Sequence, residues 1–227
     1  MYEMQGSVWF GLALLPFLCA ALFHLKYCFY ERHNYADITK TVLMPLLLAA
    51  YLIGAFTAGK MPSVLMTVAL IAGWFGDLFL LRSDKKSFVF GVLSFGTGHI
   101  LYTAFAVMKL GAVGTLNLPV LCILAVLYAG LMLFLMLRLF RYLKTMTKPV
   151  FGYMLLIAGM SICFVLYAFE QPSLASGCAA AGSVFFVLSD SLLARVEFIG
   201  GFPKSRFAVM ASYLLAQLCI AGSAVLL

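Results

Sequence analysis

The chain carries, at residues 115–137, the uncharged run TLNLPVLCILAVLYAGLMLFLML. About 20 apolar residues in an α-helix are enough to cross the hydrocarbon core of a bilayer. Runs of this kind recur along the sequence, which is 65% hydrophobic and only 10% charged. A soluble domain of this length needs far more charge to cover its surface. The run and its repetition therefore predict an all-α, polytopic membrane protein.

Eight such segments are expected to span the membrane as a bundle of transmembrane helices. They lie at about residues 7–30, 41–58, 62–81, 87–109, 115–137, 149–169, 172–194 and 205–227. The first is interpreted as a retained span, because it is too long for the core of a signal peptide and follows no basic segment. Little sequence remains between the segments, so we expect one membrane domain over residues 1–227 with antiparallel neighbouring helices.

The Lys and Arg residues gather at every second connection between these segments. Of the 15 in the chain, only Lys60 and Lys109 lie at the intervening connections. The others are Lys26, Arg32, Lys40, Arg82, Lys85, Lys86, Arg138, Arg141, Lys144, Lys148, Arg195, Lys204 and Arg206. Cytoplasmic connections of membrane proteins carry such an excess of Lys and Arg, so both termini are predicted on the non-cytoplasmic side. The membrane is expected to be a bacterial inner membrane or the endoplasmic reticulum. The net charge of +7 is accordingly assigned to contact with lipid head groups and not with nucleic acid.

Two short stretches suggest an internal repeat. Residues 76–82 read GDLFLLR and residues 189–195 read SDSLLAR, and each places an Asp five residues before an Arg at the cytoplasmic edge. Two parallel four-helix halves, about residues 1–110 and 111–227, would explain the match and would hold both acids at the same depth.

Asp77, His99 and Asp190 are the ionisable residues that lie within the predicted spans, clear of their ends. At about 1.5 Å per helical residue, each Asp lies roughly 7 Å inside the cytoplasmic boundary. A charge at the centre of a span costs roughly 2.5–3.5 kcal/mol even on lenient insertion scales, and removal from water favours the protonated form of a carboxyl group. Such acids usually serve function, although hydrogen bonding to a neighbouring helix for packing alone is the alternative.

Other polar residues could complete a site around these acids. Tyr102 lies three residues after His99, hence on the same helical face. Tyr153 and Tyr213 are polar enough to line a cavity, and Lys40 could bind a phosphate or simply mark the membrane boundary. No spacing of His and Cys indicates zinc, and we expect no metal and no cofactor. Ser189 is adjacent to Asp190, so both cannot face His99 as a triad would require.

Three motifs in their order along the chain resemble the YhhN family of small polytopic membrane lysoplasmalogenases. They are Gly76-Asp77, then Phe88, Gly91, Phe95, His99 and Tyr102, then Ser189 to Ala194. The resemblance implies a hydrolase that cleaves the vinyl ether bond of a lysoplasmalogen with water. The products would be a fatty aldehyde and glycerophosphoethanolamine or glycerophosphocholine.

This implied reaction suits a pair of carboxyl groups. A vinyl ether is hydrolysed once its distal alkene carbon is protonated, and the resulting oxocarbenium ion then captures water. Glycosidases meet a related oxocarbenium ion with two carboxyl groups. We therefore expect Asp77 and Asp190 to be catalytic, with the acid and base roles open between them. His99 and Tyr102 would orient water or a carboxyl group.

The remaining expected contacts are secondary. Ser189 and Tyr213 would supply hydrogen bonds, and the head group of the lysophospholipid would point toward Lys40 and the cytoplasmic loops. The single lipid tail would lie among apolar helices.

Two other classes of function remain open from the residues alone. A small proton-coupled transporter could use the same acids as a relay, since a parallel repeat is a known transporter layout. Such a carrier needs access from both sides of the membrane, whereas both acids are predicted near one side. A non-catalytic lipid-binding or assembly protein would leave the two acids unexplained.

Overall fold

The computed structural model describes residues 2–82, 84–111 and 116–226, with side chains described from Val8 onward. In this part of the chain the regular structure is entirely helical. The elements are α1 (Tyr2–Phe29), α2 (His33–Thr57), α3 (Val64–Phe79), α4 (Lys85–Leu110), α5 (Leu118–Leu143), the 3₁₀ turn η1 (Lys144–Met146), α6 (Thr147–Glu170), α7 (Leu174–Phe198) and α8 (Ser205–Leu226). The predicted all-α class is confirmed.

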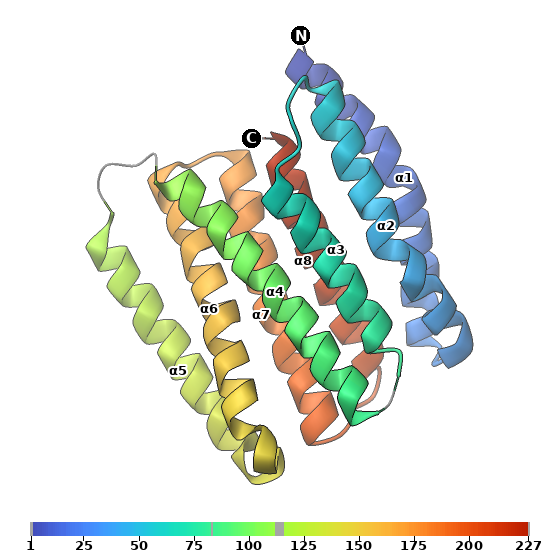
Figure 1. Ribbon diagram of the computed structural model, residues 1–227, viewed down its shortest axis with the longest axis vertical. Coiled ribbons are helices and arrows are strands. Elements are labelled where there is room, and N and C mark those ends of the chain that lie inside the picture. Colours follow the sequence, from blue (N-terminus) through green and yellow to red (C-terminus); the bar gives the residue numbers. More distant parts are fainter. Residues whose placement is uncertain (1, 83, 112–115, 227) are drawn as a thin grey trace.

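The helices run side by side and alternate in direction (Figure 1). The pair α1 and α2 forms one flank and α5 the other, with the remaining helices between them. α1 begins and α8 ends at the upper end of the bundle in this view, and the connections that carry most of the basic residues lie at the lower end. Because the connections are short, consecutive helices must lie next to each other and run in opposite directions.

Six segments of the described chain are long and apolar enough to cross a membrane, as expected of a multi-pass membrane protein. One of them, Leu118–Glu170, contains both α5 and α6, whereas α3 is shorter than the others at 16 residues. At 1.5 Å per residue α3 is about 24 Å long, less than the roughly 30 Å of a bilayer core. The count of eight crossings and the internal repeat therefore remain predictions.

The predicted helix boundaries need two corrections. α2 begins at His33 and not near residue 41, and α5 continues to Leu143 and not to residue 137. The residues added to each helix include charged ones, and a search for uninterrupted apolar runs excludes them. Lys40 consequently lies within a helix and not in the connection assumed from the sequence. Residues 115 and 227, which bound two of the predicted spans, lie outside the described residues.

Close helix packing around α3 depends on small residues. A Cβ atom at Gly76 would lie 2.7 Å from ring atoms of Phe95 on α4, and one at Gly73 would lie 2.9 Å from Nε2 of Gln217 on α8. Both distances are shorter than any ordinary carbon contact. Glycine at these positions lets α4 and α8 approach α3 closely, and α8 brings the hydroxyl of Tyr213 to Asp77.

Candidate functional site

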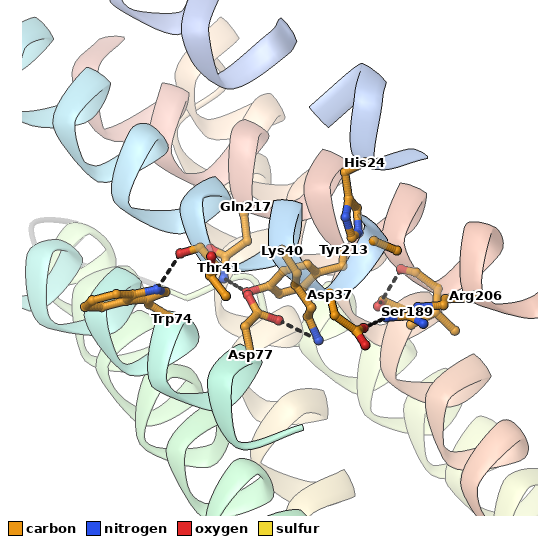
Figure 2. Close-up of polar contacts among 12 residues, drawn as sticks. His24, Asp37, Lys40, Thr41, Trp74, Asp77, Ser189, Arg206, Tyr213 and Gln217 are labelled. Atoms are coloured by element: carbon orange, nitrogen blue, oxygen red, sulfur yellow. Dashed lines mark hydrogen bonds and ion pairs between the residues drawn. The ribbon is translucent and has the colours of Figure 1, made fainter. Parts of the chain in front are cut away.

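Asp77 lies almost completely buried near the end of α3, with 2% of its surface exposed. Nζ of Lys40, from α2, lies 3.2 Å from its Oδ1 atom. The hydroxyl of Tyr213, from α8, donates a hydrogen bond of 2.8 Å to Oδ2. Figure 2 shows Asp77 between these two side chains. The carboxyl group thus has a cationic partner and a neutral donor from two other helices.

A chain of hydrogen bonds extends from Tyr213 away from Asp77. Nε2 of Gln217 donates to the Tyr213 hydroxyl at 3.3 Å, and the hydroxyl of Tyr102 donates to Oε1 of Gln217 at 2.7 Å. Tyr213 and Gln217 are four residues apart and share one face of α8. Sequence reasoning missed Gln217, although its position one turn after Tyr213 in an apolar helix was a usable signal. We call Lys40, Asp77, Tyr102, Tyr213 and Gln217 the Asp77 cluster.

Asp190 is bound by a second group of side chains, from α4 and α6. The Tyr153 hydroxyl donates to Oδ2 of Asp190 at 2.5 Å. Nε2 of His99 lies 3.3 Å from the same oxygen and 2.9 Å from the Tyr153 hydroxyl. The Asp190 side chain keeps 14% of its surface exposed, compared with 3% for that of Asp77. We call His99, Tyr153 and Asp190 the Asp190 cluster.

His99 is buried, and one of its ring nitrogens is unsatisfied. Among the buried side-chain nitrogen and oxygen atoms of the described residues, Nδ1 of His99 is the one without a hydrogen-bond partner. An unpaired buried polar atom costs about 1–3 kcal/mol. With Nε2 bound to Asp190 and Tyr153, Nδ1 can exchange a hydrogen bond with a further polar group.

An aromatic side chain separates the two clusters. The ring of Phe186 lies 4.9 Å from the His99 ring and 5.6 Å from the Tyr213 ring, measured between centroids, and is edge-to-face with each. Within the described residues, no hydrogen bond or ion pair joins Asp77 to Asp190. The structure therefore brings the predicted acids into neighbouring clusters, each with its own donors. His99 and Tyr102, expected on one helical face, belong to different clusters.

A cavity of about 420 Å³ opens beside the Asp190 cluster. Its walls come mainly from α4, α5, α6 and α7 and are mostly apolar, and Asp190 and Tyr153 are among the lining residues. Asp77 and Lys40 are not among the lining residues. No pair of described Cα atoms from α4 and α5 lies within 8 Å, although both helices line the cavity. The cavity therefore lies between α4 and α5, which form separate parts of its wall.

Two of the expected supporting residues are engaged elsewhere. Lys40 was expected near a head group, but its ammonium is paired with Asp77, so contact with a phosphate would require this ion pair to open. The hydroxyl of Ser189 donates to the backbone oxygen of Val209 on α8 at 3.1 Å, and so it links α7 to α8. In the described residues no group of three or more His, Cys, Asp or Glu side chains could hold a metal ion.

Further polar residues lie beside Lys40, where α1, α2 and α8 meet (Figure 2). His24 is fully buried, and its Nδ1 atom lies 2.9 Å from the hydroxyl of Thr39. Asp37 forms an ion pair with Arg206. These contacts could not be predicted from the sequence, because the partners are far apart along the chain.

Comparisons with known proteins connect the chain to one family of membrane enzymes. The chain is 34% identical over 161 residues to "Lysoplasmalogenase TMEM86A" of Bos taurus, covering 70% of this chain and 64% of that protein. It is 31% identical over 163 residues to the Homo sapiens protein of the same name, again covering 64% of that protein. "Lysoplasmalogenase TMEM86B" of Mus musculus is 28% identical over 180 residues, which are 72% of its length.

The chain thus spans about 64% of the length of the first two relatives. No solved structure matches it. The model of the YhhN family matches residues 35–224, which include α3 to α7 and every residue of both clusters. The resemblance seen in the motifs is thereby confirmed, and the chain belongs to the YhhN family.

Proposed function

We propose that this protein hydrolyses the vinyl ether bond of lysoplasmalogens, releasing a fatty aldehyde and glycerophosphoethanolamine or glycerophosphocholine. The names of its relatives support this reaction class. The observation that carries the proposal is the position of Asp190, a carboxyl group with two hydrogen-bond donors at the wall of an otherwise apolar cavity. This is the environment in which an alkenyl chain and a proton donor would meet.

Asp190 is the proposed acid. Its hydrogen bonds to Tyr153 and His99 both use Oδ2, so Oδ1 can carry the proton that is transferred. Protonation of the distal alkene carbon moves the alkene electrons into a new C–H bond and leaves an oxocarbenium ion. The Asp190 carboxylate, still held by its two donors, then stabilises this cation and accepts a proton from the water that attacks it. The resulting hemiacetal collapses to the aldehyde and the free glycerol hydroxyl.

Asp77 is the proposed second carboxyl group, acting through its neighbours. It holds the hydroxyl of Tyr213, whose ring lies 5.8 Å from the ring of Phe95, a residue that lines the cavity. Asp77 can therefore fix the shape of the cavity wall beside the reacting bond. In this proposal Lys40 is the counter-ion of Asp77. Tyr102 is connected to Asp77 by hydrogen bonds through Gln217 and Tyr213.

His99 and Ser189 have positioning roles in the same proposal. His99 orients the Asp190 carboxyl group through Nε2, and its unpaired Nδ1 atom is available to hold a water molecule. Ser189, next to Asp190 in sequence, fixes α7 against α8. The single lipid tail would enter from the bilayer, where α5 leaves the cavity open, and would lie among the apolar residues of α4 to α7. The membrane orientation proposed from the basic residues places the entrance in the cytoplasmic leaflet.

The test is aldehyde release from an ethanolamine lysoplasmalogen by the purified protein in detergent. We expect release by the wild type, none by Asp190→Asn, and no turnover of the saturated alkyl ether of the same chain length, because it has no alkene to protonate. Cleavage of the saturated ether would rule out the vinyl protonation step. A wild-type protein that binds the lipid but releases no aldehyde would contradict the hydrolase, and the acids would then be tested as the proton path of a carrier.

A further inference from the structure

Glu197 lines the same cavity as Asp190, at the end that lies toward the basic connections. The two acids are seven residues apart on α7, which places them on one helical face and about 10 Å apart along the axis. Glu197 lies one residue before the end of α7 and is exposed, whereas Asp190 lies deeper. A ligand in the cavity would therefore meet Glu197 at the entrance and Asp190 about two turns further in.

The charged residues that line the cavity are acidic. Among the described residues that line the cavity, the charged side chains are Asp190 and Glu197, and Lys and Arg do not contribute. The neighbouring Arg195 is turned elsewhere, since it donates to the backbone oxygen of Gly200 at 2.8 Å and lies over the ring of Phe202. An unneutralised carboxylate at the mouth attracts a cation and repels an anionic phosphate.

Two aromatic residues line the same end of the cavity as Glu197. Phe88, in the first turn of α4, and Phe198, the last residue of α7, both line the cavity. Their centroids are 5.9 Å apart and their planes are nearly perpendicular. Aromatic rings attract ammonium groups through their negative faces, and quaternary ammonium ligands are often recognised in this way.

We propose that Glu197, Phe88 and Phe198 bind the ammonium group of an ethanolamine or choline head group. The head group belongs to a single-chain lipid whose tail occupies the cavity past Asp190. The inference rests on the proposed function for its choice of lipid, and it adds the residues that select the head group. It also means that a lipid with a bare phosphate, which lacks the cation, is disfavoured at this entrance.

The experiment measures equilibrium binding of two saturated lipids, hexadecyl lysophosphocholine and hexadecyl lysophosphatidic acid, to the purified full chain in detergent. Neither ligand can be turned over, so binding is read without catalysis. Glu197→Gln should weaken binding of the phosphocholine lipid about threefold, as expected of an exposed charge pair, and strengthen binding of the phosphatidic lipid, because the repulsion of its phosphate is removed. Glu197→Lys should reverse the preference between the two lipids, and Phe198→Leu should weaken only the phosphocholine lipid, again about threefold.

Glu31→Gln is the matched control, because Glu31 is an exposed acid at the same end of the bundle and outside the cavity lining. It should change neither affinity. Equal effects of Glu197→Gln on both lipids, no effect on either, or a wild type without preference would overturn the inference. Aldehyde release is measured separately on the same proteins. Loss of the proposed function, seen as no release by the wild type, is therefore distinct from loss of head-group selection.

Discussion

The two acid clusters differ in what balances the carboxyl group. Asp77 faces the ammonium of Lys40 and is buried among α2, α3 and α8, whereas Asp190 is hydrogen-bonded to Tyr153 and His99 and borders a cavity. A buried ion pair is held together strongly, because removal of one partner leaves an uncompensated charge. A carboxyl group that has no Lys or Arg partner among the described residues and borders a cavity is instead accessible to a ligand. In our proposal Asp190 therefore carries the chemistry and Asp77 acts through its neighbours, although both were found by the same sequence criterion.

Substitution of Asp190 should give the largest effect on activity. Asp190→Asn keeps the shape of the side chain but cannot deliver a proton, so the rate of aldehyde release should fall by about 10²–10⁴-fold, the usual contribution of a general acid or base. The thermal midpoint should change little, because no charged partner is left alone. Ser191→Ala is a suitable control, since its hydroxyl lies in the same cavity lining but bonds to the backbone oxygen of Val187. Release within tenfold of wild type would remove Asp190 from the chemistry.

Substitution of Asp77 should show its main effect in stability. Asp77→Asn leaves the buried Lys40 ammonium without its anion, and breaking such a pair typically costs about 3–5 kcal/mol. The double substitution Asp77→Leu with Lys40→Met removes both charges and should recover much of this loss. Unfolding in mixed micelles measures both variants. An Asp77→Asn protein as stable as wild type yet inactive would contradict the comparison and give Asp77 a direct chemical role.

The two tyrosines that donate to the acids offer a smaller, symmetrical test. Loss of a hydrogen bond to a charged group costs about 1.5–3 kcal/mol. Tyr153→Phe should lower kcat by about tenfold to a hundredfold, with little change in stability. Tyr213→Phe should instead lower the free energy of unfolding by about 1.5–3 kcal/mol. It should change kcat less than Tyr153→Phe does. If both substitutions affected kcat equally, the division between the clusters would not hold.

Packing around Gly73 should give the smallest effect. A Cβ atom there would press on Nε2 of Gln217, so Gly73→Ala should cost about 1–3 kcal/mol of stability, as overpacked positions do. Gly159→Ala on α6 is the control, because its added methyl group would meet nothing within 4 Å and should be neutral or stabilising. Thermal unfolding of both variants checks this. No loss for Gly73→Ala would show that Gln217 moves freely within the Asp77 cluster.

Much of the fold was predictable because apolar length alone indicates membrane helices. The prediction failed at the start of α2, where Asp37 and Lys40 interrupt the apolar pattern. Their partners are Arg206 on α8 and Asp77 on α3, and no local window contains such distant residues. Charged residues inside a helix can be accommodated when another helix neutralises them.

Most members of the candidate site were predictable, but Gln217 and the division into two clusters were not. Asp77, His99 and Asp190 stood out as polar groups in apolar segments, but their donors come from other helices. The division made by the Phe186 ring depends on packing, which the sequence does not display. Glu197 was overlooked because a charge at the end of a span is ordinary at a membrane surface.

The separation of α5 from α4 has a consequence for kinetics. In the proposed function, the substrate enters the cavity from the plane of the membrane between α4 and α5, and an oily product returns to the same plane. For such a site the relevant concentration is the mole fraction of substrate among the surrounding lipids or detergent. Adding inert amphiphile should therefore slow turnover even when the amount of substrate per volume stays constant.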